Sequence, residues 1–527
     1  MDIGISYKQK PVSGNYDAIV IGSGIGGLAT AAVLAKRARK RVLVLERHYT
    51  AGGFTHSFTR PGYEWDVGVH YIGQVGERGP LRAPFEYITE GRLDWAPLPD
   101  VYDRVYLGDR SYDFVAGTKR FLATMKERFP SEARALDRYV DLVKACGRAG
   151  TPYFLDKALP GAASRVLGPL LRARYLRHAR ATTAEVMASL TRDRELVSVL
   201  TAQFGDYGLP PRQSSFAMHA AVVGHYLGGA YFPVGGSSAI ARAIAPTIES
   251  AGGAIYVSAE VAQVIVEGGR AHGVRMADGR EVRAPVVISD AGMANTFGQL
   301  VPAASVPRAA TEALSRVSAS VGHMCLYLGF EHTDEELGLS GTNLWIYPDG
   351  DHDENIARFL ADPEAPLPLV YVSFPSAKDP TFRERHPGRA TVDVITLARY
   401  DWFERWSGSR WKKRGADYDA LKERFTERIL EVLFSKVPQL RGKIAFMELS
   451  TPLTTRHFGG HPHGELYGLD HTPARFRLPL RPATSIRGLF LTGQDISTCG
   501  VGGALLGGVI TAAAIEGPGA LVEVMRP

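Results

Sequence analysis

The sequence contains few cysteines and no low-complexity tract. Its 527 residues include three cysteines, Cys146, Cys325 and Cys499, an odd number at wide spacing. This pattern excludes a disulfide-stapled secreted scaffold, and reduced thiols in a cytoplasmic setting fit it best. The first residues carry no apolar run, so we expect neither a secretory signal nor an N-terminal anchor.

The sequence also lacks the signatures of a metal site and of a nucleic-acid-binding site. No group of His, Cys, Asp or Glu residues has metal-ligand spacing, so we expect no metal site. The net charge is only +6, and no nucleic-acid-binding motif accompanies the basic segments, so we expect no nucleic-acid partner. With 45% hydrophobic and 22% charged residues the chain is globular, and its length predicts at least two lobes.

One long uncharged stretch needs an explanation. From Ile496 to Ile515 the chain "ISTCGVGGALLGGVITAAAI" has no charged side chain, which is about the length of a bilayer-spanning helix. However, five glycines interrupt it and Asp495 stands directly before it. Glycine lets a backbone approach a ligand closely, and helix N-termini attract anions. The alternative to a membrane span is therefore a buried helix beside a large anionic cofactor.

A second segment, residues 160–180, mixes leucines with arginines in "PGAASRVLGPLLRARYLRHAR". Basic amphipathic helices can lie in a membrane surface, although solvated faces look similar. We treat it as a candidate membrane-contacting helix. The expected location is cytoplasmic, with peripheral contact to a membrane surface. The oligomeric state has no signature in the sequence.

The N-terminal region carries a dinucleotide-binding pattern. A buried strand, "YDAIVI", leads into "GSGIGG", a helix, and a second strand, "RVLVLE". Gly22 permits the tight turn, Gly24 lets the backbone approach a diphosphate, and Gly27 allows close packing of helix on strand. Glu46 ends the second strand, where it would accept hydrogen bonds from ribose hydroxyls.

The continuation after Glu46, with Arg47, Gly52 and Gly53, resembles flavoproteins of the amine oxidase and phytoene desaturase superfamily. The resemblance implies FAD, with adenine contacted by the backbone of Val261 and the flavin ribitol near Asp495. No second G-x-G-x-x-G marks a nicotinamide domain. Taken together, the cofactor residues expected from motif and resemblance are Gly22, Ser23, Gly24, Gly27, Glu46, Arg47, Gly52, Gly53, Phe54, Val261, Gly493, Asp495, Gly502, Gly503 and Ala504.

A closer likeness rests on a set of segments: "GSGIGGLATAAVLAK", "YEWDVGVHYIG", "YFPVGGSSAIA", "YDWFERW", "LYGLDHT" and "LTGQDISTCGVGGALLGG". As a set these resemble the retinol saturases, which are related to carotenoid isomerases and desaturases. The resemblance implies non-covalent FAD, a long apolar polyene as substrate, and saturation of one double bond by flavin hydride transfer. It also implies a long apolar substrate tunnel, and we expect residues 160–180 near its mouth. Such a reduction needs an external electron donor, NAD(P)H or another.

Four residues are candidates for handling the proton: Tyr467, His70, Tyr71 and Glu465. Tyr467 is the first choice and His70 the second, although each of the four also has an ordinary packing explanation. Glu465 departs from the saturases, which carry a small residue or Cys there. A carboxylate near an apolar tunnel would bind a polar substrate end or have a raised pKa. Cys499 lies outside the motif for cysteinyl flavin attachment, so we expect a buried thiol.

The expected fold is α/β. A Rossmann-type FAD-binding domain with a parallel, glutathione reductase-like sheet would comprise 1–80, 230–300 and 480–527. A substrate lobe of mixed or antiparallel sheet plus helices would comprise 81–229 and 301–479. Alternatives on this fold are a carotenoid isomerase or desaturase, and a non-enzymatic protein that binds prenyl lipids.

Overall fold

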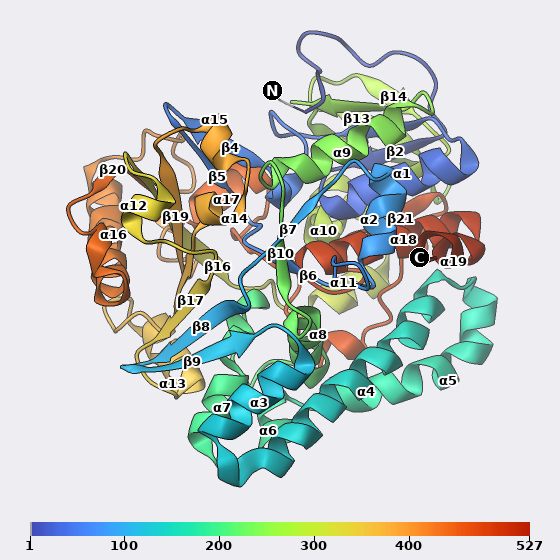
Figure 1. Cartoon of the computed structure of the whole chain (residues 1–527). Coiled ribbons are helices and arrows are strands. Elements are labelled where there is room, and N and C mark those ends of the chain that lie inside the picture. Colours follow the sequence, from blue (N-terminus) through green and yellow to red (C-terminus); the bar gives the residue numbers. More distant parts are fainter. Residues whose placement is uncertain (1–2, 527) are drawn as a thin grey trace.

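A six-stranded parallel sheet forms one side of the molecule in the computed structural model, which describes residues 3–526 (Figure 1). Neighbouring strands follow the order β1, β11, β3, β2, β15, β21, and every pair is parallel. Their bounds are β1 (Ile5–Ser6), β2 (Ala18–Ile21), β3 (Val42–Leu45), β11 (Ala254–Val257), β15 (Val286–Ser289) and β21 (Leu489–Leu491). Strands β2 and β3 are wholly buried, as continuous apolar runs in parallel sheets are.

Helices cover this sheet, and one of them is the uncharged stretch. They are α1 (Ile25–Ala38), α2 (Arg82–Thr89), α9 (Ser238–Glu249), α18 (Gly500–Glu516) and α19 (Gly519–Val524). A Cβ at Gly508 of α18 would lie 2.5 Å from the backbone oxygen of Gly26, so glycine permits the close packing of α18 on α1. The interpretation of the stretch as a buried helix is confirmed, because α18 is largely inaccessible. None of the helices within residues 3–526 is long and apolar enough to cross a bilayer.

The other side of the molecule is built on a seven-stranded sheet (Figure 1). Its order is β20 (Ile444–Ser450), β16 (Gly322–Phe330), β19 (Ala390–Ala398), β18 (Val370–Ser373), β17 (Asn343–Tyr347), β8 (Val101–Leu107) and β9 (Arg110–Val115). The pairs are antiparallel except β17 with β8. The α/β class, with one parallel and one mixed sheet, is thus confirmed.

The remaining longer helices lie along both sides: in Figure 1, α3, α6, α7 and α8 lie together below the seven-stranded sheet, and α4 and α5 extend below α18 and α19 of the first side. Helix α16 packs on β18 and β19. The bounds of these elements are α3 (Thr118–Arg128), α4 (Ala133–Ala158), α5 (Gly161–Ala179), α6 (Thr183–Leu190), α7 (Arg194–Leu200), the 3-10 turn η3 (Ala202–Asp206), α8 (Phe216–Tyr226), α16 (Ala416–Lys436) and α17 (Pro452–Gly459). Short helices complete the chain: α10 (Gly292–Asn295), α11 (Arg308–Leu314), α12 (Asp334–Leu337), α13 (His352–Ala361), α14 (Pro375–Lys378) and α15 (Phe382–Arg385).

Two small sheets lie between the two sides: β4 (Ser57–Arg60) with β5 (Tyr63–Asp66), and β6 (Ile72–Gly73), β10 (Ala230–Pro233) and β7 (Trp95–Pro97). A third, β12 (Val261–Glu267), β13 (Arg270–Met276) and β14 (Glu281–Arg283), packs beside β15 on the first side. All strands of the parallel sheet lie within the segments expected for the cofactor domain, and all strands of the seven-stranded sheet lie within those expected for the substrate lobe. The domain limits themselves stay a prediction. Helix α2, just beyond residue 80, packs on α1 and α9 of the first side.

Candidate active site

A cavity of about 670 Å³ runs from the glycine turn after β2 to the inner face of the seven-stranded sheet. Its first end is lined by backbone at Gly22, Gly24, Gly52 and Gly53. Its other end is lined by larger apolar residues, Trp345, Leu369, Tyr371, Ile395 and Leu397. The volume lies in the range typical of small-molecule and cofactor sites.

The glycine turn has the geometry that close approach requires. Gly22 has φ +95°, a conformation that side chains disfavour. A Cβ at Gly27 would lie 2.4 Å from the oxygen of Gly22, so only glycine allows α1 to start this close to β2. Gly24 is the N-cap of α1 and offers no side-chain cap. The cavity therefore meets the positive end of a helix, which suits an anionic diphosphate.

Glu46, immediately after β3, is tied to the turn by Ser23. Its Oε2 accepts hydrogen bonds from the Ser23 backbone N–H at 2.9 Å and from the Ser23 hydroxyl at 2.7 Å. Its Oε1 accepts from the His48 N–H at 2.7 Å, and the Ser23 oxygen accepts from the Gly52 N–H at 3.0 Å. A carboxylate has about four acceptor sites, so Glu46 keeps capacity for ribose hydroxyls.

Asp290 is a residue of this site that the sequence motifs did not predict. It follows β15 directly, just as Glu46 follows β3 and Asp495 comes after β21, so three acids gather at the carboxyl edge of one parallel sheet. A Cβ at Gly24 would lie 2.5 Å from Asp290 Oδ2. Burial raises the pKa of Asp290 to about 8, so at neutral pH this carboxyl is mainly uncharged. The signal that could have found it is the apolar strand "VVIS" followed by an acid.

Asp495 joins three segments near the start of α18. It accepts hydrogen bonds from the N–H of Met293 at 2.8 Å and of Leu469 at 3.1 Å. The buried guanidinium of Arg475 lies 3.9 Å from its Oδ1. Helix α18 begins after Cys499 without a side-chain cap and lines the cavity through Gly500, Val501 and Ala504. A second uncapped helix start thus faces the same space.

The other expected cofactor residues divide into two groups. Those that line the cavity, besides the ones above, are Arg47, Phe54 and Val261. Five do not line it: Ser23, Gly27, Gly493, Gly502 and Gly503. These five support its walls; a Cβ at Gly493, for example, would meet Asp290 Oδ1 at 2.3 Å. Direct contact of each residue with the cofactor stays a prediction, but the bare backbone and the two uncapped helices fit FAD.

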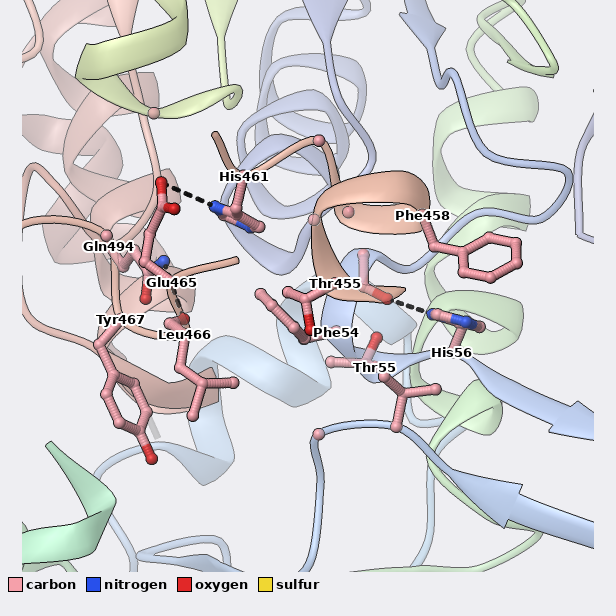
Figure 2. Close-up of a pocket in the computed structure, with 18 of the residues that line it drawn as sticks. Phe54, Thr55, His56, Thr455, Phe458, His461, Glu465, Leu466, Tyr467 and Gln494 are labelled. Atoms are coloured by element: carbon pink, nitrogen blue, oxygen red, sulfur yellow. Dashed lines mark hydrogen bonds and ion pairs between the residues drawn. The ribbon is translucent and has the colours of Figure 1, made fainter. Parts of the chain in front are cut away.

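Glu465 and Tyr467 lie close in sequence but point in opposite directions (Figure 2). Glu465 accepts from the His463 N–H at 2.8 Å, and its Oε1 is 3.7 Å from His461 Nδ1. Burial opposes ionisation of Glu465, but His461 and the backbone hydrogen bonds outweigh it and lower its pKa. Of the two alternatives for Glu465, the raised pKa is therefore wrong, because histidine and backbone donors already hold the carboxylate. The other alternative, that Glu465 binds a polar end of the substrate, stays a prediction.

Tyr467 lines the cavity, and its hydroxyl donates to the backbone oxygen of Gly205 at 2.9 Å. His70 also lines it, with Nδ1 3.5 Å from Asp393 Oδ2, and burial lowers the pKa of His70 to about 3. That imidazole is therefore neutral and lacks the second proton of an imidazolium, the one that a histidine acid would give up. Tyr71 is not a lining residue, and its hydroxyl lies behind the wall.

The three cysteines are unpaired and buried, as expected for Cys499. Burial raises the pKa of the Cys499 thiol to about 12, so it is an inert group at neutral pH. Within residues 3–526, no cluster of His, Cys, Asp or Glu is placed to hold a metal ion.

Known proteins share this architecture. Residues 25–516 match the family model "Flavin containing amine oxidoreductase". The chain is 40% identical to the all-trans-retinol 13,14-reductase of Danio rerio, over 95% of this chain and 86% of that protein. It is 34% identical to an inactive all-trans-retinol 13,14-reductase of Danio rerio, over 97% and 87% of the two chains. It is 28% identical to the chloroplastic prolycopene isomerase of Arabidopsis thaliana, over 91% and 79%.

Among solved structures, a putrescine oxidase bound to putrescine superimposes with a TM-score of 0.62, covering 95% of this chain and 99% of that chain at 16% identity. This likeness supports the fold. The glycine turn, the acids at the sheet edge and the matches to known proteins lead to one assignment. The chain belongs to the flavin containing amine oxidoreductase family, alongside the all-trans-retinol 13,14-reductases, and is an FAD-dependent oxidoreductase.

Proposed function

We propose that this enzyme saturates one double bond of a retinoid-like polyene. The observation that carries the proposal is the continuity of one cavity from the glycine turn to an apolar chamber against the seven-stranded sheet. The relatives named all-trans-retinol 13,14-reductase support the substrate class. The test is the reaction of the reduced enzyme with all-trans-retinol, scored by product mass.

The bound FAD would supply hydride, that is, two electrons with one hydrogen, after reduction by an external donor of the NAD(P)H type or another. The chain's own residues do the rest. The bare backbone at Gly22, Gly24 and Gly53 leaves room for the diphosphate, and Glu46 offers acceptors for the ribose. Asp495, fixed by two backbone N–H donors, holds the segment before α18 in place.

The apolar chamber suits a polyene. Its wall includes Trp345, Leu369 and Leu397, all buried side chains. Apolar contact stabilises a bound chain by about 25 cal/mol per Å² removed from water. It also excludes water, so proton transfer to or from the substrate depends on the few polar groups that line the cavity.

A carotenoid isomerase or desaturase is the alternative, supported by the likeness to a prolycopene isomerase. It would use the same cavity and cofactor. The three activities differ in whether the substrate keeps, returns or loses two electrons, and the mass of the product separates them. Saturation adds two hydrogens, isomerisation leaves the mass unchanged, and desaturation removes two hydrogens.

We also propose a cytoplasmic protein that touches a membrane surface through α5. Three large apolar side chains on one turn of this helix are exposed: Val166 (78%), Leu167 (49%) and Leu170 (79%). Exposed apolar groups next to arginines are typical of helices that lie in an interface. Helix α5 contributes no residue to the cavity lining, contrary to the expectation that it would lie at the tunnel mouth.

A loop nearer the cavity carries a second basic surface. Trp411 is half-buried and lines the cavity, and Arg410, Lys412 and Lys413 beside it are exposed. The ammonium of Lys412 lies 4.7 Å from the Trp411 ring centre. Each basic residue near an anionic surface adds about 1 kcal/mol to binding. This loop would bring the mouth of the cavity toward the lipids that contain the substrate.

The test replaces Leu167 and Leu170 together by glutamate and measures co-sedimentation with vesicles of anionic phospholipid. We expect at least a tenfold weaker partition, since burying each leucine is worth about 1.5–3 kcal/mol. Arg172 is left intact because it pairs with the buried Asp156 at 2.9 Å.

Met447→Glu is the matched control, since Met447 is exposed to 55% on β20, far from α5 in Figure 1. If the double variant sediments with vesicles as wild type does, α5 does not contact the membrane and is an ordinary solvent-exposed helix. In that case a loss of binding on charge reversal of Arg410, Lys412 and Lys413 would place the contact at the loop.

A further inference from the structure

The hydroxyl of Tyr71 lies between two carboxyl groups. Its oxygen is 3.1 Å from Asp103 Oδ2 and 3.1 Å from Asp206 Oδ2. A phenol has one proton, so it donates to only one of them. The second contact is a hydrogen bond only if the other carboxyl is protonated and donates to the Tyr71 oxygen. Two ionised carboxylates around one hydroxyl would leave an unscreened repulsion in a buried place.

The partners of the two acids decide where that proton resides. Asp103 is inaccessible and accepts from Gln203 Nε2 at 2.8 Å and from Asn343 Nδ2 at 2.9 Å, as a carboxylate does. Asn343 in turn accepts from the ammonium of Lys378. Among residues 3–526, Tyr71 is the only hydrogen-bond partner of the Asp206 side chain. The proton therefore belongs to Asp206, with Tyr71 donating to Asp103.

Asp206 is also the member of this group that faces the cavity. It ends the 3-10 turn η3 and lines the cavity, whereas Tyr71 and Asp103 do not. Its backbone oxygen lies 3.6 Å from the sulfur of Cys499, the residue that directly precedes α18. Its neighbour Gly205 accepts the Tyr467 hydroxyl. The residue that carries this carboxyl thus lies beside the start of the helix that lines the cofactor end of the cavity.

We propose that Asp206 is the acid that protonates the polyene. The inference rests on the proposed function. As the polyene gains hydride at one carbon, negative charge develops at another. The O–H bond of Asp206 breaks, its electron pair stays on the carboxylate, and a C–H bond forms with the proton at that second carbon. Tyr71 then turns its own O–H from Asp103 to the new carboxylate, since both oxygens lie within its reach, and solvent returns the proton.

The surroundings favour a retained proton on Asp206. Titratable groups reach it from several elements: Asp103 on β8, Tyr226 on α8, Tyr371 on β18, and Tyr71, Tyr467 and Cys499 on connecting segments. Burial, and then the neighbouring Asp103 carboxyl, raise the pKa of Asp206 well above its ordinary value, against a smaller opposite effect of Tyr71. Activity that depends on this acid should therefore be retained well above the ordinary pKa of an aspartic acid and fall as the pH rises through the raised pKa of Asp206.

The other candidates are less able to act. Tyr467 donates its proton to a backbone oxygen, His70 is a neutral imidazole, and Glu465 is an ionised carboxylate held by His461. Tyr71 is a positioning residue, because it holds Asp206 and does not line the cavity.

The test uses Asp206→Asn, which keeps a donor for the Tyr71 oxygen but has no proton to transfer. Anaerobic mixing of chemically reduced holoenzyme with all-trans-retinol should show flavin reoxidation slowed by about 10² to 10⁴, the usual contribution of a positioned acid. FAD content and retinol affinity should stay at wild-type values. Infrared spectra of the resting enzyme should lose the C=O band that the protonated Asp206 contributes, while the band of the uncharged Asp290 carboxyl stays. Asp137→Asn, a partly exposed aspartate on α4, is the matched control.

The outcomes separate the two claims. A wild type that reduces no polyene overturns the proposed function and, with it, the acid role of Asp206. A wild type that reduces retinol while Asp206→Asn reacts equally fast overturns only the role of Asp206. A purely structural role predicts that asparagine is tolerated and leucine is not, so wild-type rates in Asp206→Asn with loss of rate in Asp206→Leu also overturn the proposal.

Discussion

Replacing Gly24 with valine is expected to yield a colourless protein that purifies without FAD. Gly24 lines the cavity as the N-cap of α1 and is crowded from two sides. A Cβ at Gly24 would lie 2.5 Å from Asp290 Oδ2. Gly53 approaches from another side, since a Cβ built on Gly53 would lie 2.9 Å from the Gly24 Cα. A branched side chain has room only on the cavity side, which is the space the diphosphate needs.

The measurement is the ratio of flavin absorbance to protein absorbance after purification. Gly147→Val is the matched control, because Gly147 is an exposed residue of α4 and a Cβ there would meet no heavy atom of another segment of residues 3–526 within 4 Å. Both variants introduce the same side chain. A Gly24→Val protein with a full complement of FAD would show that the cofactor diphosphate does not lie at this turn.

Replacing Asp495 with alanine should lower the free energy of unfolding of the apoprotein by about 3–5 kcal/mol, the usual cost of breaking a buried ion pair from one side. The side chain of Arg475 is 2% exposed and lies 3.9 Å from Asp495. The alanine variant leaves this guanidinium without its carboxylate. It also leaves two backbone donors, the N–H groups of Met293 and Leu469, without an acceptor.

Urea unfolding followed by circular dichroism measures the effect. Glu312→Ala serves as the control, because Glu312 pairs with Arg308 on an exposed helix face, where such pairs are worth at most about 1 kcal/mol. An Asp495→Ala protein that unfolds at the same urea concentration as Glu312→Ala would show that the Arg475 charge is neutralised in another way.

Much of the cofactor half could be predicted from the sequence, since its signals are local. The turn from Gly22 to Gly27, the acid at Glu46 and the glycine-interrupted helix after Asp495 each lie within one strand-turn-helix unit. Parallel strands present their carboxyl ends at one edge, so acids that follow such strands converge. Asp290 obeys the same rule and was missed only because its helix, α10, is short and carries no glycine motif.

The substrate half depends on contacts between distant segments, which local patterns do not encode. Tyr71 meets Asp206 across 135 positions and Asp103 across 32. The choice of Tyr467 as first proton donor rested on its place in a motif, whereas its hydroxyl is engaged by Gly205 from another segment. The error at Glu465 has the same origin: burial was foreseen, but the imidazole of His461 was not.

The most direct test of the account is a single anaerobic reaction. Wild-type holoenzyme is reduced by light, mixed with one equivalent of all-trans-retinol, and followed by flavin absorbance and by mass spectrometry of the extracted lipid. The account predicts flavin reoxidation together with a product that is heavier by two hydrogens. Retinol recovered at unchanged mass, with the flavin still reduced, would contradict it.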